Sequence, residues 1–162
     1  MTRWLSDDEQ ASWRAWIAAS LLLPDRLNRY LQDEAGISLA DYEILVYLSE
    51  SPDRRLRMSE LADRTLSSRS RLSHQVDRLT DAGFVDREPC SQDRRGYFAV
   101  LTPRGWDFLV ASAPTHVASV REHLVDVLTP DEFAELGRLC AKVTERLRPA
   151  EDPCCEGSDG SA

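Results

Sequence analysis

The side chains best suited to bind another molecule lie between Ser67 and Arg95 and combine hydroxyls, one imidazole and several guanidinium groups. Such groups donate hydrogen bonds to phosphate oxygens and to the edges of bases. The candidates for these contacts are Ser67, Ser68, Ser70, Arg71, Ser73, His74, Arg78, Arg94 and Arg95. The pattern predicts a surface that binds double-stranded DNA.

The overall charge at first argues against a polyanionic partner, because the chain of 162 residues has a formal net charge of -8. The charge is unevenly distributed, however. Between Arg54 and Arg104 there are 11 arginines and 7 acidic residues, a net of +4, whereas the rest of the chain carries -12. A basic middle with acidic ends favours a local anion-binding face. The alternative is a solvated, arginine-rich surface with no ligand.

Motifs for catalysis and metal binding are missing from the sequence. There is no glycine-rich phosphate loop, no HExxH and no GxSxG, so we expect no catalytic residue, no enzyme and no cofactor. The cysteines form no CxxC pair and, with the histidines, show no zinc spacing, so we expect no metal site and no disulfide scaffold. The four cysteines are Cys90, Cys140, Cys154 and Cys155. A passive and a reactive thiol both remain open for Cys90.

Length and composition predict one compact unit, because 162 residues is close to the most common domain size of about 150. With 42% hydrophobic and 30% charged residues, the chain is neither collagen-like nor wholly disordered. The longest apolar run, Trp16 to Leu23, is shorter than the roughly 20 residues of a membrane span. We therefore expect a cytoplasmic protein with no membrane partner.

Helix signals dominate the first half of the chain. Ser6 and Glu9 form a capping-box pair, which predicts a helix from Asp7 that Pro24 kinks or breaks and that ends near Gly36. Three shorter helices are predicted to follow. The first begins with a capping box at Ser38 to Asp41 and closes at Ser51-Pro52, the second follows Ser59, and the third runs from Ser68 to a stop at Gly83.

The spacing of the apolar residues changes after Gly83, from a helical pattern to short strand-like runs. Phe84 to Glu88 and Tyr97 to Leu101 are two strand-like runs separated by a polar loop, which predicts a hairpin. Pro89 places the first strand at an edge. Three short helices followed by a hairpin with an arginine-rich tip are typical of a winged helix-turn-helix, with the Ser68 to Ala82 helix presented outward.

The last third of the chain predicts two helices with a packing period of about 3.5 residues. The first begins at Thr102-Pro103 and carries the seam Trp106, Val110, Ala113, Val117, Val120, Leu124 and Val127, interrupted by Pro114. The second follows the capping box Thr129 to Glu132 and carries Phe133, Leu136, Cys140, Val143 and Leu147. These seams and the first helix predict a helical dimer interface. A monomeric bundle is the alternative.

The predicted fold class is therefore mostly α, within α+β. It is a winged helix-turn-helix with a two-stranded wing, in which N- and C-terminal helices form a dimerisation bundle. The expected divisions are an N-terminal dimerisation helix (1–36), the winged lobe (37–103), C-terminal dimerisation helices (104–148) and a disordered tail (149–162).

The central motifs resemble the MarR family of bacterial transcriptional regulators. They are Ser59 to Ala62, the run SSRSRLSHQVDRLTDAGFVDR from Ser67 to Arg87, Asp93 to Gly96, and Leu101 to Gly105. The resemblance implies a homodimer with two winged lobes on a pseudo-palindromic operator. It further implies a repressor that releases DNA when a small aromatic molecule binds. It places Arg94 and Arg95 at the wing tip, with Asp93 supporting Arg95.

A small aromatic effector could bind an aromatic box that contains one cation. The candidates are Trp13, Arg14, Trp16, Tyr42, Trp106 and His116. Core packing or surface exposure is the alternative for each of them. For the protein as a whole, the alternative function is a winged-helix module that binds a protein partner without DNA specificity.

Overall fold

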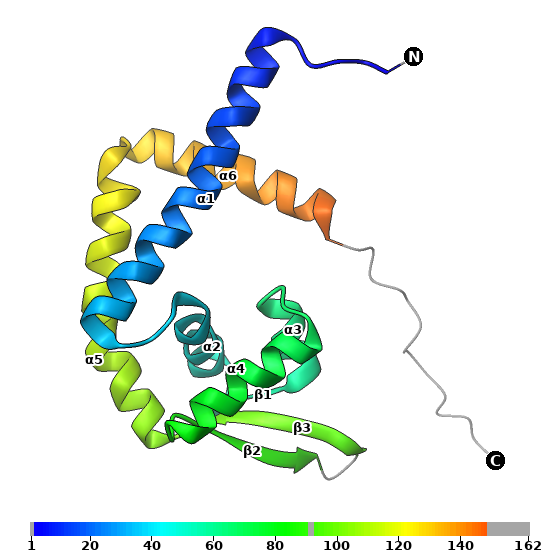
Figure 1. Cartoon of the computed structure of the whole chain (residues 1–162), viewed down its shortest axis with the longest axis vertical. Coiled ribbons are helices and arrows are strands. Elements are labelled where there is room, and N and C mark those ends of the chain that lie inside the picture. Colours follow the sequence, from blue (N-terminus) through cyan, green and yellow to red (C-terminus); the bar gives the residue numbers. More distant parts are fainter. Residues whose placement is uncertain (1, 91–92, 149–162) are drawn as a thin grey trace, which may run out of the picture.

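The computed structural model describes residues 2–90 and 93–148, and for residues 93–95 it describes the backbone alone. The predicted tail 149–162, with Cys154 and Cys155, lies outside the described residues. Within them, long helices frame a small winged lobe (Figure 1). The elements in chain order are α1 (Asp7–Ala35), α2 (Leu39–Glu50), η1 (Pro52–Arg54), β1 (Arg55–Arg57), α3 (Met58–Arg64), α4 (Arg69–Asp81), β2 (Val85–Cys90), β3 (Asp93–Leu101), α5 (Pro103–His123), η2 (Val125–Val127) and α6 (Pro130–Leu147).

Helix α1 confirms the predicted ends but not the predicted break. Ser6 and Glu9 form the reciprocal capping box, and Gly36 ends the helix in the left-handed conformation at φ 69°. The chain nevertheless stays helical through Pro24, so of the two predicted alternatives, a kink or a break, the break is wrong. A proline removes one backbone donor. The buried Leu27 and Leu31 that follow it anchor the second half of the helix against the lobe.

The sheet of the lobe has three antiparallel strands in the order β1-β3-β2. The two-stranded wing is confirmed as β2 and β3, and Pro89 lies on the edge strand as predicted. The sequence pattern did not predict β1. This strand is only three residues long, and its single buried residue, Leu56, stands between two arginines.

The hydrophobic core lies inside the winged lobe. Its fully buried side chains come from the helices and from β2 and β3, and they include Leu31, Ile44, Leu45, Leu48, Leu61, Leu72, Val76, Val85 and Ala99. Helix α5 packs against α1 and α2 with Leu109 and Ser112 buried. The core therefore packs against one side of α4 and leaves the opposite side of the helix exposed to solvent.

Much of the predicted dimer surface is exposed in the single chain. Helix α6 has no buried residue, and Phe133, Leu139 and Val143 are 38%, 45% and 50% exposed. Helix α5 ends at His123, so its seam is shorter than the predicted run to Val127. The exposed Val110 and Val117 belong to that seam, whereas another face of α5 is buried within the chain.

Gly105 allows α5 to approach the residues that follow α4, Gly83 and Phe84, closely. Its N–H donates to Thr102 Oγ1 at 3.0 Å, and the Thr102 hydroxyl donates to the Gly83 carbonyl at 2.8 Å. A Cβ atom at position 105 would lie 2.1 Å from the Phe84 carbonyl oxygen. The run from Leu101 to Gly105 thus lets the start of α5 pack closely against Gly83 and Phe84, which follow α4.

We expect Gly105→Ala to lower the free energy of unfolding by about 3 kcal/mol, because a backbone atom must move to admit the new methyl group. Chemical denaturation at a fixed protomer concentration measures this change. The matched control Asp107→Ala, an exposed position in the same helix, should change stability by less than about 0.5 kcal/mol. An equal effect of the two substitutions would contradict the close approach.

Candidate nucleic-acid interface

Helix α4 presents a polar face away from the core. Ser68 caps it, because its Oγ accepts the Arg71 N–H at 3.3 Å. Its buried residues are Leu72, Gln75, Val76 and Leu79, the side predicted by helical periodicity together with Gln75. Of the candidate contact residues on this helix, Ser70, Arg71, His74 and Arg78 are exposed and Ser73 is half-buried.

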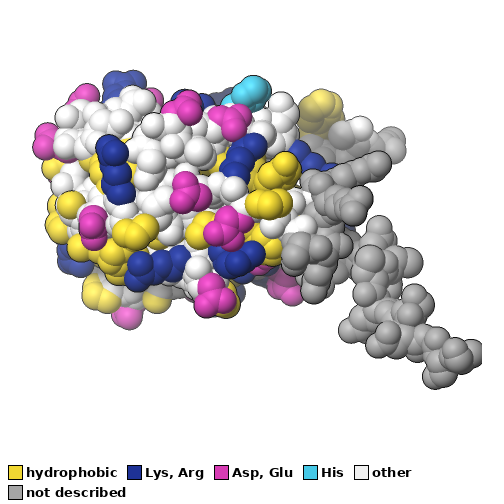
Figure 2. Space-filling view, turned by 90° about the horizontal axis from the view of Figure 1, so that it is seen from below, with side chains coloured by type: hydrophobic (Ala, Val, Ile, Leu, Met, Phe, Trp, Pro, Cys, Tyr) yellow, Lys and Arg dark blue, Asp and Glu magenta, His cyan; other side chains and the backbone are white. Residues whose placement is uncertain are grey.

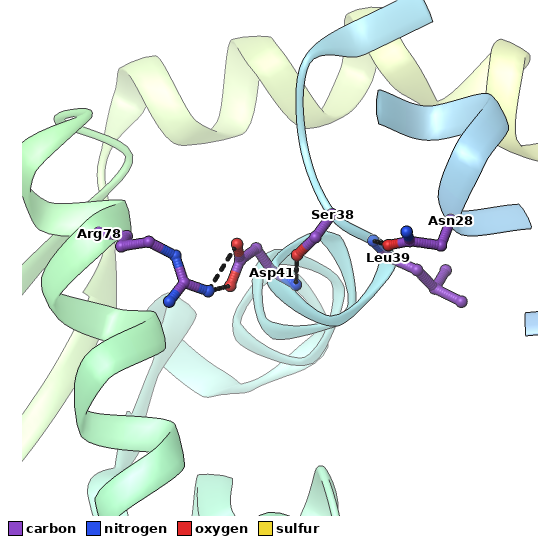
Figure 3. Close-up of polar contacts among 5 residues, drawn as sticks. All are labelled: Asn28, Ser38, Leu39, Asp41 and Arg78. Atoms are coloured by element: carbon purple, nitrogen blue, oxygen red, sulfur yellow. Dashed lines mark hydrogen bonds and ion pairs between the residues drawn. The ribbon is translucent and has the colours of Figure 1, made fainter. Parts of the chain in front are cut away.

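Arg78 anchors one flank of α4 to α2. Its Nη2 donates to both carboxylate oxygens of Asp41, at 2.8 and 3.0 Å (Figure 3). The Asp41 side chain is only 10% exposed, whereas that of Arg78 is 58% exposed. The structure therefore gives Arg78 a partner within the chain, which the sequence pattern had not indicated.

The start of α2 is capped from two directions (Figure 3). Ser38 Oγ accepts the Asp41 N–H at 3.1 Å, and Asn28 Oδ1 of α1 accepts the Leu39 N–H at 3.0 Å. The predicted capping box at Ser38 and Asp41 forms only by half, because the carboxylate turns to the guanidinium of Arg78. A charged donor is the stronger partner for a buried carboxylate.

Arg87 of β2 anchors the other flank of α4. Its Nη2 donates to the Ser73 carbonyl and to Ser73 Oγ, each at 3.0 Å, and lies 3.0 Å from Asp77 Oδ1. Sequence reasoning missed this residue. The signal was available, since Val85 and Arg87 share one face of the strand by its period of two, and Val85 is buried.

A polar groove of about 680 Å³ runs along α4 on the side of α1 and α2. Amide, hydroxyl, imidazole and guanidinium groups from the three helices line it. These residues are Asn28, Gln32, Ser38, Ala40, Ser68, Ser70, Arg71, His74, Gln75 and Arg78. The exposed residues of α4 therefore form one wall of a groove rather than part of a flat surface.

The wing carries the remaining candidates. The side chains of Asp93, Arg94 and Arg95 lie outside the described residues, and so does the predicted pairing of Asp93 with Arg95. The backbone of Asp93 pairs with that of Cys90, whose side chain is buried. On the face seen from below in Figure 2, basic and acidic side chains of the described residues are mixed and do not form one continuous basic patch.

The candidate effector residues fall into three places. Tyr42 and His116 are in contact, with ring centroids 4.7 Å apart. Trp106 is covered by Arg54, whose guanidinium carbon lies 3.8 Å from the ring centroid. Trp13, Arg14 and Trp16 lie on the exposed first half of α1. Within the described chain, the structure brings together only Tyr42 and His116.

The Tyr42 and His116 pair is placed between α2 and α5. Burial lowers the pKa of His116 below its ordinary value and raises the pKa of the Tyr42 hydroxyl. Nδ1 of His116 is buried and has no hydrogen-bond partner among the described residues. The imidazole is thus favoured in its neutral form.

Other kinds of site find no support in the described part of the chain. No group of three or more His, Cys, Asp or Glu side chains there is placed to hold a metal ion. None of the described helices is both long enough and apolar enough to cross a membrane.

Known proteins with the same fold identify the family. The MarR family model matches residues 35–96. The chain is similar to the regulator Sco3205 from Streptomyces coelicolor, solved in complex with DNA, at 48% identity with a TM-score of 0.89, covering 94% of this chain and 96% of that one. The chain belongs to the MarR family. A second MarR regulator from that organism, AbsC, is 49% identical with a TM-score of 0.84, over 90% of this chain and 98% of its own.

Similarity extends to other helix-turn-helix (HTH-type) transcriptional regulators. The repressor YetL of Bacillus subtilis is 31% identical over 72% of this chain and 70% of its own. Membership confirms the predicted family, the winged helix-turn-helix and the prediction that the chain is a transcriptional regulator rather than an enzyme.

The lowered pKa of His116 predicts a pH-dependent stability. The unfolded chain takes up a proton near pH 6.5 more readily than the folded one, so the free energy of unfolding should fall as the pH drops below about 6.5. His116→Phe should make this dependence shallower, and the exposed control His74→Gln should not. Urea titrations between pH 5 and pH 8, a range around the ordinary His pKa, measure the slopes. Parallel slopes for wild type and His116→Phe would rule out this role.

Proposed function

We propose that this MarR-family chain is a homodimeric repressor that binds a pseudo-palindromic DNA operator. The observation that carries the proposal is the exposed stripe of α4, Ser70, Arg71 and His74, on a helix held at both flanks by ion pairs. The similar protein Sco3205 was solved with DNA, and a MarR variant of Escherichia coli, 26% identical with a TM-score of 0.71, was solved with operator DNA. A repressor role is supported by the relatives named repressors, YetL and MprA.

The candidate residues on α4 and on the wing have different proposed roles. Arg71 forms no ion pair with any described residue, and His74 is exposed beside it, so these two side chains are free to reach base edges. Ser67, Ser68 and Ser70 surround the helix N-terminus, where backbone N–H groups attract a phosphate. Arg78 is committed to Asp41 and contributes mainly by holding the helix. Arg94 and Arg95 supply phosphate or minor-groove attraction from the wing.

A second copy of the chain is the proposed partner of the exposed helices. Large apolar side chains are exposed along both α6 and the first half of α1, among them Trp13, Leu21 and Val143, and contiguous exposed apolar surface marks an interaction site. A two-fold dimer would present two α4 helices to successive major grooves, with half-sites about 34 Å apart.

A small aromatic effector is proposed to act between α2 and α5. Tyr42 and His116 form an aromatic pair there. Nδ1 of His116 is buried and has no hydrogen-bond partner among the described residues, so it could accept a hydrogen bond from a phenol that enters between the two helices as they separate. The first-helix candidates Trp13, Arg14 and Trp16 could join such a site only from a partner subunit or after rearrangement, and Trp106 only after Arg54 moves.

Variants of α4 and the wing should separate base reading from phosphate attraction. Arg71→Ala or His74→Ala should cost about 1–3 kcal/mol at particular base pairs, whereas Arg94→Ala or Arg95→Ala should weaken binding to all sequences and lower the salt slope by about one. The measurement is the binding affinity as a function of salt concentration. It is made for an operator duplex selected from genomic fragments and for a scrambled version of that duplex. Arg29→Ala, an exposed position on α1, is the control.

Footprinting should show an inverted repeat. Protection without dyad symmetry would contradict the dimeric mode. A protein that retains no duplex in the selection would instead favour the alternative in which the lobe binds a protein partner.

Leu136→Asp should dissociate the dimer or unfold it, because it places a charge in the apolar seam of α6 and removes roughly 2 kcal/mol of burial. Sedimentation over a range of protomer concentrations measures the association. Lys142→Asp, on the opposite side of α6, is the control and should leave the dimer intact. A wild-type chain that sediments as a stable monomer would overturn the proposed assembly.

A further inference from the structure

Arg87 makes the side-chain hydrogen bonds that join the wing strand β2 to helix α4 in the described part of the chain. It reaches from β2 to α4, and its side chain is 29% exposed. One nitrogen, Nη2, faces three acceptors at 3.0 Å, namely the Ser73 carbonyl, Ser73 Oγ and Asp77 Oδ1. The guanidinium has no freedom to turn outward without leaving these oxygens.

This geometry determines what the Ser73 hydroxyl can do. A serine hydroxyl can either donate or accept, because its hydrogen rotates. Here the oxygen already accepts from a charged donor, so its hydrogen points elsewhere. In this fold, hydroxyls within helices often donate to the preceding turn, as Thr80 Oγ1 does to the Val76 carbonyl at 2.8 Å. Ser73 makes no such bond with a described residue, so its hydrogen remains available.

Arg87 also changes the charge on the same flank. Asp77 lies on the outward half of α4, and its side chain is 54% exposed. An unpaired carboxylate there would repel the phosphate backbone. The guanidinium 3.0 Å away offsets this charge.

We infer that Arg87 is a positioning residue that makes Ser73 a hydrogen-bond donor to DNA and neutralises Asp77. The inference rests on the proposed DNA-binding function. A donor at this place selects an acceptor, such as guanine O6 or N7, thymine O4 or a phosphate oxygen. It disfavours a base edge that itself presents an amino group, such as cytosine N4. Arg87 therefore contributes to specificity without contacting a base.

The test is binding-site selection from a randomised inverted-repeat duplex library, followed by affinity measurements on all four bases at each position. Ser73→Ala and Arg87→Gln should flatten the preference at the same base pair of each half-site by about fivefold, the effect of one neutral hydrogen bond. The double variant should be no flatter than Ser73→Ala. Arg55→Gln, which removes an arginine paired with Glu88 on the same sheet, is the matched control and should leave the base preference unchanged.

Two further variants separate charge from hydrogen bonding. Arg87→Lys keeps a positive charge near Asp77, but its shorter side chain ends before the position from which Nη2 contacts Ser73, so it should restore overall affinity and leave the base preference flattened. Asp77→Asn in the Arg87→Gln background should likewise recover affinity without recovering the preference. Ser73→Ala changes no charge and preserves the helix. It therefore tests the base preference even if an Arg87 variant does not fold.

The outcomes distinguish the two levels of the argument. A wild-type protein that selects no duplex overturns the proposed function. A wild-type protein that selects an operator, but whose Ser73→Ala variant keeps every base preference, overturns the role of Arg87 alone. Flattening at different base pairs in the Ser73 and Arg87 variants would do the same.

Discussion

The buried carboxylate of Asp41 is the constraint on which the rest of the interface depends. Taken out of water, an ionised group must be paired and hydrogen-bonded, and here Arg78 supplies the charge. Asp41 stands in the first turn of α2, next to the backbone groups that Ser38 and Asn28 cap. One ion pair therefore joins helix α4 to helix α2, whose first backbone N–H, that of Leu39, is in turn bonded to Asn28 of α1.

An acidic protein can bind a polyanion when the acids near the interface are already paired. The chain carries a net charge of -8, yet Asp41 faces Arg78 and Asp77 faces Arg87 on the two flanks of α4. Arg71 and His74 then stand on an exposed stripe whose two neighbouring acids are both paired. The local pairing of charges, rather than the total, determines the field that a phosphate meets.

Local sequence signals predicted most of the fold. What they could not predict were the contacts between residues far apart in the chain. The caps at Ser6, Ser68, Thr102 and Thr129 are short-range hydrogen bonds, so the sequence predicted these helix starts. The buried side of α4 followed from its period. The pairing of Asp41 with Arg78 joins residues 37 apart, which no local pattern encodes. The strand β1 was missed because three residues are too few to show a period, and α1 continued through Pro24 because tertiary packing offsets the lost donor.

The measurement that tests the central claim most directly is a double-mutant cycle on Asp41→Asn and Arg78→Gln, read out as free energy of unfolding and as operator affinity at one protomer concentration. Because Arg78 is partly exposed, we expect a coupling of about 1–2 kcal/mol in unfolding, below that of a fully buried pair. We expect Asp41→Asn, a change at a side chain that is only 10% exposed, to weaken operator binding as well. Additive effects on stability, or an Asp41→Asn variant that binds the operator as tightly as wild type, would contradict the account.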